Sequence, residues 1–471
     1  MADSDSSVAN HPSILRAMPS LPAMLGFAMP NAISFQIALG PPLVLMARHW
    51  GASSFYIGAI AALVPLLTMT QLYMAPRVEY LGFKRVMLAG WTGRIVTLIL
   101  TAALPFCSGF LSRRFQLEAL FAFMFLFNLL RGLATASWMP WVKELVPERW
   151  RGRYLSAEQV VVNISSALTL FGCGWVLGDD PGDFQFGFLF IVSFVAGMTS
   201  LYFLKRIDCP PPLDGAPTLE PVRRWVNRVW RVKPFRRLIR LNMLWTFALG
   251  AWGTFTVVYL RDGLHFPERI ILYMSASSTL GALLSAWVWG LMADRFGSRP
   301  VMALTSRLIL LTALCWLLLT LGLIPPAVGT VLILYILLGM GTSGFGVAIN
   351  QYSLNNAPAG FPVLALSLFA ATSSFSSALS PFLWGALLDL LAPVRPRVGP
   401  LLLHQYVWFY ALIALMIVAS KHLIRQLPDH KAAATHIVLY HMITDYPLRT
   451  LYAVQGMLTG RTRREGPPTR G

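Results

Sequence analysis

The sequence predicts an all-α polytopic membrane protein with twelve transmembrane helices in two pseudo-symmetric six-helix halves. Three observations lead to this prediction. First, 56% of the 471 residues are hydrophobic and only 12% are charged, with a mean hydropathy of +0.60, whereas soluble domains carry about 25% charged residues. Second, the apolar residues form twelve long runs. Third, short patterns recur between the first six runs and the last six.

Each apolar run is long enough to be a transmembrane helix, which needs about 20 mostly apolar residues. In the first half the runs are 21–47, 55–76, 85–107, 117–139, 154–178 and 184–205. In the second half they are 238–260, 269–293, 300–323, 326–349, 361–391 and 401–425. The least certain boundaries lie at the short break 324–326 and the polar stretch 350–358. A β-barrel, the structural alternative, would show alternating segments of about ten residues instead.

The net charge of +18 would suggest nucleic-acid binding in a soluble protein. Here Lys and Arg gather in alternate loops, as at 77–85, 143–153 and 205–240, which is the positive-inside pattern. We therefore expect a protein of the plasma (bacterial inner) membrane with both termini cytoplasmic and no nucleic-acid partner. The tail 1–20 lacks the pattern of a cleaved signal peptide, and we assign no function to the tail 426–471.

The longest internal loop, 206–237, divides the chain into the halves 21–205 and 238–425. Within it, apolar residues recur at helical spacing with arginines between them: Val222, Trp225, Val226, Val229 and Trp230. This pattern suits a basic amphipathic helix on an anionic cytoplasmic leaflet. A solvated linker helix explains it equally well.

The two halves also share local sequence. SSALT at 165–169 matches SSALS at 376–380, and EYLGFKRVM at 79–87 aligns with DRFGSRPVM at 294–302. Self-similarity over such distances indicates a duplicated unit. A duplicated membrane protein with a site at the repeat interface is the plan of a transporter.

The segment GLMADRFGSR at 290–299 resembles the loop signature of the major facilitator superfamily. That signature is a Gly, an acid–Arg pair, a Gly and a basic residue between the second and third helices of a half. The first half keeps it less fully, with Ala75 in place of the first Gly and Tyr80 in place of the Arg. The basic segment 143–153 resembles the loop after the fourth helix of that family. The resemblance covers about residues 20–425 and implies a secondary transporter whose halves rock around a central site.

The resemblance also implies a cytoplasmic gate in these loops. An acid there can face a helix N-terminus or an Arg in one conformation only, and glycine permits close approach or a positive φ. The predicted gate residues are Glu79, Gly82, Lys84, Gly290, Asp294, Arg295, Gly297 and Arg299. The alternative is an anchor that only fixes the orientation of the chain.

Charges inside spans need a reason, because each costs about 2.5–3.5 kcal/mol on insertion scales. Arg131, with Asn128 one turn before it, is the strongest candidate for substrate contact. In the family plan, helices one, four, seven and ten line the cavity. The predicted substrate-binding residues are Asn31, Gln36, Asn128 and Arg131, joined by Gln159 and Asn163 and by the apolar walls Trp245 and Trp252. The alternative is interhelical hydrogen bonding that only packs the bundle.

Arg94 and Arg307 occupy equivalent places in the third helix of each half, which is peripheral in the family plan. We interpret both as structural, at a depth that permits snorkelling towards the headgroups. No Asp or Glu lies at the middle of a span, so proton coupling by a buried carboxylate is unsupported. Three arginines in the spans without such acids favour an anionic solute.

The sequence offers no chemistry for an enzyme. It has no phosphate-binding loop of the GxxxxGK[ST] type, no nucleophile or metal constellation, and four cysteines without disulfide or metal spacing. We expect no cofactor and a monomer whose partners are a small-molecule substrate and the lipid bilayer. The runner-up function is a transport-inactive membrane scaffold or assembly factor with the same fold.

Overall fold

The computed structural model describes residues 19–209, 211, 222–358, 361–394, 396–398 and 401–428. Within these residues, twelve helices are long and apolar enough to cross a membrane. They confirm the predicted fold class and match the twelve predicted runs. The largest differences are extensions, because the fourth span continues to Leu145 and the tenth to Asn355. Most of the predicted tails, 1–18 and 429–471, lies outside the described residues.

The first half contains six spans, several of them interrupted. The elements are α2 (Leu21–Leu39), α3 (Pro41–His49), α4 (Ser54–Thr68), α5 (Gln71–Met74), η1 (Ala75–Arg77), α6 (Val78–Leu81), α7 (Phe83–Phe106), α8 (Arg113–Thr135), α9 (Trp138–Leu145), α10 (Glu148–Leu177) and α11 (Asp183–Lys205). Helix α12 (Val222–Trp230) then lies in the predicted amphipathic segment, and its Val229 is buried against the second half.

The second half repeats the plan. Its elements are α13 (Lys233–Gly250), α14 (Trp252–Val258), η2 (Tyr259–Gly263), α15 (Glu268–Phe296), α16 (Ser298–Thr320), α17 (Val328–Asn355), α18 (Pro362–Leu391), the two-residue strands β1 (Arg397–Val398) and β2 (Leu401–Leu402), and α19 (Gln405–Arg425). The strands form one small antiparallel hairpin before the last span.

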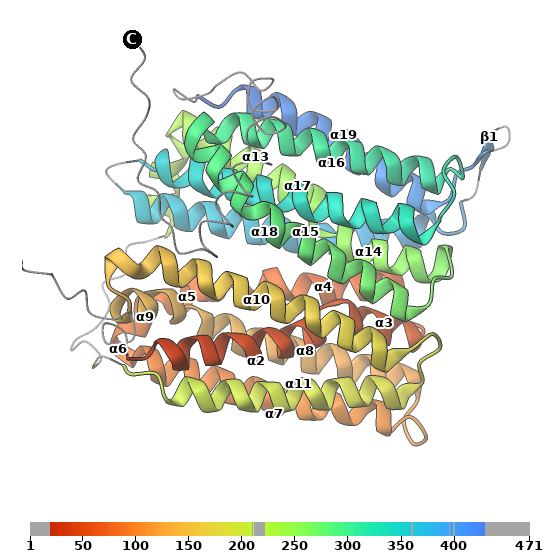
Figure 1. Cartoon of the computed structure of the whole chain (residues 1–471), viewed down its shortest axis with the longest axis horizontal. Helices are drawn as coiled ribbons and strands as arrows, with labels where there is room; N and C mark the ends of the chain where they lie inside the picture. The colour runs from red at the N-terminus through yellow and green to blue at the C-terminus, as the bar shows by residue number, and fades with distance from the viewer. Residues whose placement is uncertain are drawn as a thin grey trace, which may run out of the picture.

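The helix pairs of one half have counterparts in the other. Helix α2 packs on α10 and α11 as α13 packs on α18 and α19, and α8 packs on α4 and α7 as α17 packs on α15 and α16. The halves meet along two equivalent seams, α4 with α18 and α10 with α15. The sequence repeat therefore corresponds to a two-fold repeat of packing, and Figure 1 shows the halves as two groups of nearly parallel helices.

The first helix of each half is broken near its middle. Helix α2 ends before Gly40, whose backbone is extended (φ −93°, ψ −165°), and Pro41 begins α3, where its missing N–H costs nothing. In the second half α13 gives way to α14 at Ala251, and the five-residue π-helical turn η2 follows. Breaks at membrane depth are tolerated where they line a cavity, so these two helices point to the site.

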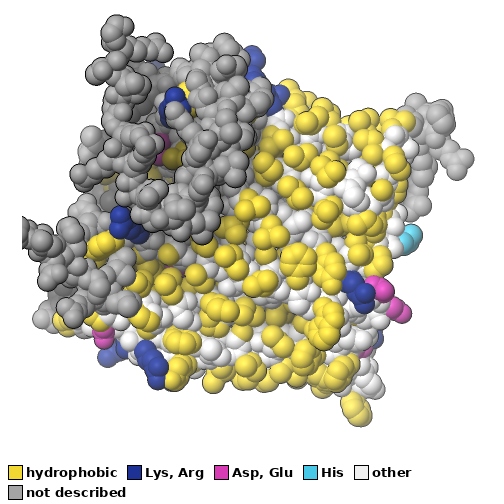
Figure 2. Space-filling view, viewed as in Figure 1, with side chains coloured by type: hydrophobic (Ala, Val, Ile, Leu, Met, Phe, Trp, Pro, Cys, Tyr) yellow, Lys and Arg dark blue, Asp and Glu magenta, His cyan; other side chains and the backbone are white. Residues whose placement is uncertain are grey.

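The two ends of the bundle differ in charge. One end, called the basic end, carries α5, α6 and α9 with Lys84 and Arg85, and the loop at Arg295 and Arg299; it lies to the left in Figure 1. The other, called the acidic end, carries Asp179, Asp180, Asp183, Asp262 and Asp389. Between the ends, hydrophobic side chains cover the face formed by α10, α2 and α11 (Figure 2), as a bilayer requires.

Close backbone contact holds the α4–α18 seam together near the acidic end. A Cβ added at Gly58 would lie 2.0 Å from the carbonyl oxygen of Pro381, and one added at Gly385 would lie 2.5 Å from that of Ser54. Each half thus contributes one glycine to the crossing. Backbone atoms cannot move aside as a flexible side chain can, so any larger residue here must separate the halves.

We expect Gly58→Val to lower the stability of the detergent-purified protein by about 1–3 kcal/mol, the usual cost of overpacking. The measurement is thermal unfolding followed by tryptophan fluorescence. Gly290→Val is the matched control, because a Cβ at that helical glycine meets nothing within 4 Å. Equal unfolding temperatures for the two variants would contradict the close seam.

Candidate solute cavity between the halves

A cavity of about 440 Å³ lies between the two halves. The broken helices contribute Gly40 and Pro41 from the first half and Gly253 and Thr254 from the second. The rest of the lining comes from neighbouring positions of these broken helices and from α10, α15 and α17. The lining residues are Gln36, Leu39, Val44, Asn163, Leu170, Val257, Ser275, Ser278, Thr279, Ala282, Tyr335, Leu338, Gly339 and Thr342, with the four just named. No charged side chain belongs to this described lining.

The polar groups of the cavity fall into two sets. Ser275, Thr279 and Thr342 donate to carbonyl oxygens of their own helices, at 2.9, 3.4 and 2.8 Å respectively. These hydroxyls are already satisfied by the backbone. The second set has no side-chain hydrogen bond among the described residues: Gln36, Asn163, Thr254 and Ser278. The first two are amides of the first half, and the other two are hydroxyls of the second.

Two of the predicted substrate-binding residues, Gln36 and Asn163, therefore line the cavity. Gln36 lies just before the break at Gly40, and Asn163 lies on α10 in the fifth span. Both side chains are half-buried. The assignment of Gln36 from the first helix and of Asn163 from the fifth agrees with their positions, and their contact with a solute stays a prediction.

Asn31, also predicted to face a solute, contacts Arg94 instead. Its Oδ1 accepts from Arg94 Nη2 at 2.8 Å and from Trp91 Nε1 at 3.3 Å. The Arg94 guanidinium lies 4.3 Å from the Trp91 ring centre and 4.4 Å from that of Phe35. Arg94 is fully buried, so it does not snorkel: cation–π contacts and one amide hold it inside the half, in the structural place that was expected for it. Arg307, by contrast, is exposed.

Asn128 and Arg131 lie side by side on α8, but they do not line the described cavity. Arg131 Nη2 donates to the Val64 carbonyl (2.8 Å) and to Thr68 Oγ1 (2.7 Å), and its Nε donates to Asn128 Oδ1 (3.2 Å). Val64 and Thr68 belong to α4. The arginine thus ties the fourth span to the second, the packing role that was the alternative to substrate contact.

The remaining three candidates also lie away from this cavity. Gln159 is exposed on α10, one turn from Asn163. Trp245 stacks on Phe345 with ring centres 3.5 Å apart and planes 12° apart. Trp252 is 1% exposed and packs edge-on against Tyr410. The two tryptophans therefore join α13 and α14 to the core of the second half.

Sequence reasoning missed the cavity residues of the second half. Ser278, Thr254 and Tyr335 come from the eighth, seventh and tenth spans, whereas no residue was assigned from the eighth or tenth. Spans contain many hydroxyl residues that bond to their own helix, and only the fold tells which remain unpaired. The sequence did contain a signal for the eighth span. Four of the five residues Ser275–Thr279 carry a hydroxyl, although they lie in an apolar helix.

At the acidic end, polar contacts join the halves. Arg48 of α3 forms an ion pair with Asp262 of η2, and Arg269 pairs with Asp179 at 3.4 Å. Asp389 of α18 accepts from the first two backbone amides of α4, those of Ser54 (3.0 Å) and Phe55 (2.8 Å). A carboxylate is stabilised at a helix N-terminus by the unpaired amides and the helix dipole. Each of these three links must break for the halves to part here.

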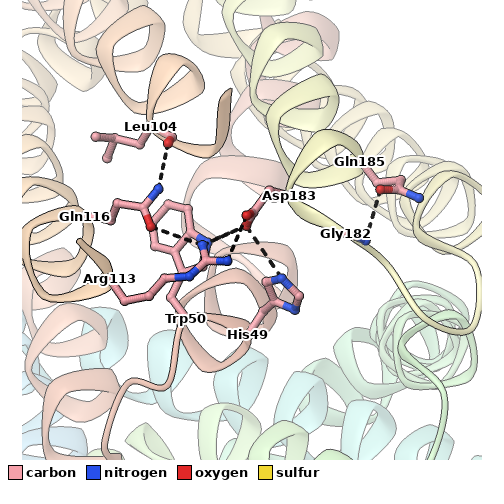
Figure 3. A network of polar contacts seen from close by, with 8 residues as sticks. All are labelled: His49, Trp50, Leu104, Arg113, Gln116, Gly182, Asp183 and Gln185. Atoms are coloured by element: carbon pink, nitrogen blue, oxygen red, sulfur yellow. Dashed lines mark hydrogen bonds and ion pairs between the residues drawn. The ribbon is translucent and has the colours of Figure 1, made fainter. Parts of the chain in front are cut away.

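A second network braces the first half behind these links. Asp183, at the start of α11, accepts from Trp50 Nε1 at 2.7 Å and from both Nη atoms of Arg113 at 2.9 and 3.1 Å. His49 approaches the same carboxylate at 3.5 Å. Figure 3 shows these side chains converging on Asp183 from the ends of the first and fourth spans. Arg48 is thereby carried on a segment that is fixed to α11 and, through Asp183, to α8.

At the basic end, the described contacts of the predicted gate stay within one half. Lys84 donates to the Ile207 carbonyl (2.9 Å), Gln351 donates to Asp294, and Arg299 donates to the Arg425 carbonyl (2.9 Å). Glu79 is exposed, and Arg295 lies 5.1 Å from the ring centre of Phe296. The gate assignment stays a prediction, and in this conformation Asp294 is bonded to an amide of its own half.

The gate glycines differ in role. Gly82 and Gly297 have φ of +87° and +91°, so both make turns that favour glycine, as expected. Gly290 does not permit a close helix approach, because a Cβ there would meet nothing within 4 Å. The expectation that Gly290 allows two helices to approach closely is therefore wrong.

A duplicated bundle with a cavity between its repeats and broken helices lining it defines the membrane transporter class. The family model of the Major Facilitator Superfamily matches residues 23–381 and, in an overlapping second match, 259–436. The chain belongs to the major facilitator superfamily. Comparison with curated proteins finds no match.

Solved structures share the fold at low sequence identity. The nucleoside transporter NupG matches with a TM-score of 0.63 and 12% identity over 87% of this chain and 98% of its own. A D-xylose-proton symporter gives 0.63 and 13% over 88% and 97%. A bacterial homologue of the iron transporter ferroportin, in an inward-facing state, gives 0.64 and 13% over 88% and 99%. These likenesses concern the fold.

We expect Arg131→Ala to lower the thermal stability of the solute-free protein, because the hydrogen bonds from Arg131 to the Val64 carbonyl and to Thr68 Oγ1 are lost. The cost of such a loss is about 1–3 kcal/mol. Arg131→Lys, which keeps one donor, should recover part of it. Unchanged unfolding temperatures in both variants would show that the arginine does not clamp these helices.

We expect Asp262→Asn to populate a conformation in which the acidic end is open, because the ion pair with Arg48 is removed. Spin labels at Phe110→Cys and Leu323→Cys, one exposed loop position in each half, report the separation by double electron–electron resonance in a background lacking the four native cysteines. Glu118→Gln is the control, since the Arg114–Glu118 pair lies within one helix. A distance distribution that matches the control would overturn the role of the link.

Proposed function

We propose that this protein is a secondary active transporter that moves a small uncharged polar solute by alternating access of the cavity between its halves. The observation that carries the proposal is the cavity itself. Its lining comes from both halves. When the halves move relative to each other, the contacts of a bound solute with each half therefore change. A site at the interface of two repeats is what a rocking mechanism requires.

The conformation described here supports that mechanism. The acidic end is closed by the ion pairs Arg48–Asp262 and Arg269–Asp179. Hydrogen bonds from the first backbone amides of α4 to Asp389 of α18 close it as well. The predicted gate at the basic end makes contacts within each half instead. With the basic end cytoplasmic, as the positive-inside pattern predicts, this is an inward-facing conformation, and opening outward would exchange one set of contacts for the other.

The charge of the solute follows from the lining. An anionic solute was favoured by the three arginines in the spans, but Arg94 lies in an aromatic cluster, Arg131 bonds to α4, and Arg307 is exposed. None of them belongs to the described lining. A charged solute in a cavity without a counter-charge loses much of its hydration for little return. Amide and hydroxyl groups suit an uncharged solute.

The alternative, a transport-inactive scaffold, has less support. A scaffold has no use for four polar side chains that line a cavity in the middle of a bilayer without a hydrogen bond to another described residue, because polar groups there are costly. The less complete signature loop of the first half is the feature that favours it. Solute-dependent stabilisation distinguishes the two functions, because a ligand that binds the folded state raises its apparent stability.

Two libraries test the proposal on the purified full-length protein. One holds uncharged monosaccharides, polyols and nucleosides, including D-xylose and uridine; the other holds carboxylates and phosphates of similar size. We expect compounds of the first library to raise the unfolding temperature and to accumulate in proteoliposomes. Stabilisation by the second library alone would overturn the uncharged class. Stabilisation by neither would favour the scaffold.

A further inference from the structure

We propose that the first half carries a binding site for one anionic phospholipid from the leaflet at the basic end. One acyl chain of the lipid lies in a groove between α2, α10 and α11, and its phosphate binds Arg206. The groove has a volume of about 860 Å³, compared with about 440 Å³ for the solute cavity. It belongs to one half and shares no lining residue with that cavity, so the inference goes beyond the proposed function.

The groove forms where a glycine, a proline and an alanine meet. Helix α2 packs on both α10 and α11 and lies between them in Figure 1. On α2, Gly26 has no side chain, and Pro30 lacks the N–H that would pair with the Gly26 carbonyl. Pro30 and Ala196 of α11 are both buried at the base of the groove. Larger side chains at these positions would fill it.

The lining of the groove suits hydrocarbon. Met29, Phe188, Ile191 and Val195 stand at its edges with 37–54% of their surface exposed. The one polar side chain, Thr199, donates to the Val195 carbonyl at 2.9 Å, so its own helix satisfies the hydroxyl. No charged side chain belongs to the described lining. Such a surface offers no hydrogen bond to a polar ligand.

The length of the groove fits an extended acyl chain. Along α11 the lining runs from Phe188 to Phe203, which are 15 residues apart. At a rise of 1.5 Å per residue this distance is about 22 Å. The hydrocarbon core of a bilayer is about 30 Å thick, so the groove runs from one headgroup layer past the midplane. A long acyl chain, when extended, spans that depth.

The width of the groove argues against a protein helix as the occupant. A volume of about 860 Å³ over about 22 Å gives a mean cross-section of about 40 Å². An α-helix with its side chains is about 10 Å across and therefore needs about 80 Å². A partner helix could rest on the edges of the groove but could not enter it, whereas a single hydrocarbon chain can.

Arg206 lies where the groove reaches the headgroups. Thr199 and Phe203 line the groove at a spacing of four residues, and Arg206 follows three residues later on the same face of α11. It is the C-cap of the helix and keeps a helical backbone (φ −89°, ψ −7°). Its side chain is exposed, and its guanidinium lies 4.1 Å from the ring centre of Tyr202. A guanidinium can bind two phosphate oxygens at once.

The charges beside Arg206 favour an anionic headgroup over a zwitterionic one. Lys205 is exposed, and Lys84 Nζ donates to the Ile207 carbonyl at 2.9 Å. The nearby acid is Asp208, which accepts from Ser20 Oγ at 2.8 Å. Three cations thus outweigh one carboxylate at this end of α11. Basic clusters at the ends of spans are typical of anionic lipid recognition.

The headgroup contact is tested with phosphatidylglycerol and phosphatidylcholine that carry identical acyl chains. Each lipid is titrated into the delipidated full-length protein in an uncharged detergent, and thermal unfolding and native mass spectrometry report binding. We expect phosphatidylglycerol to stabilise the wild type more. Arg206→Gln should weaken its binding about 5-fold, as expected for one Arg at an anionic surface. Lys205→Gln, the matched control on another face of α11, should change it less.

The acyl-chain contact is tested by filling the groove. Thr199→Phe places a ring in it at an exposed position, and we expect this variant to lose the stabilisation by phosphatidylglycerol. Met198→Phe is the control, because Met198 is 47% exposed on the same helix but does not line the groove. It should keep the stabilisation. The unfolding temperatures of both variants without lipid show whether the substitutions themselves disturb the fold.

Three results would overturn the inference. Equal losses in Arg206→Gln and Lys205→Gln would mean that only diffuse charge attracts the lipid. Full stabilisation of Thr199→Phe by phosphatidylglycerol would place the chain elsewhere. A dimer of the wild type in detergent that Thr199→Phe alone converts to a monomer would show that a second copy covers this face instead.

Discussion

The membrane-embedded backbone of this protein must satisfy its own hydrogen bonds, and most of the structure follows from that constraint. It makes every span helical. It also makes each interruption informative, because an unpaired peptide group in hydrocarbon is costly. The breaks at Gly40 and Ala251 lie in equivalent helices of the two halves, and the residues beside them line the cavity between the halves. The helices are thus interrupted at the place where polar groups line the cavity.

The two buried arginines meet this constraint unequally. The rings of Trp91 and Phe35 and the Asn31 amide surround Arg94, whose Nε and Nη1 have no hydrogen bond among the described residues. Arg131 donates hydrogen bonds to two uncharged oxygens of α4. Both charges stiffen the first half, and both lie outside the described lining of the cavity. The described lining of the cavity is left with uncharged groups. A solute dissociates from such groups more easily than an ion dissociates from a strong ion pair.

Conformational change requires contacts that are strong enough to hold and weak enough to break. The links at the acidic end fit this need, since each is partly exposed and is formed between residues carried by different halves. Behind them, Asp183 gathers Trp50 and Arg113 within one half. Rigid halves and a breakable interface are the two conditions for a rocking motion, in which one end closes as the other opens.

The twelve spans, the two halves and the family can be read from the sequence, because apolar length, repeated patterns and the loop at 290–299 are local properties. The sequence also drew attention to Gln36 and Asn163, which line the cavity, since an amide in an apolar helix is visible in the sequence. It did not separate Arg131 from a substrate site, because clamp and ligand contact have the same signature of a polar residue in a span. The three-dimensional packing shows instead that Arg131 bonds to α4, that Arg94 is enclosed by aromatic rings, and that Thr254 and Ser278 line the cavity. A hydrogen bond depends on which groups lie close in space. Partners such as Val64 and Arg131 are 67 residues apart in sequence, so no local sequence pattern can indicate that they meet.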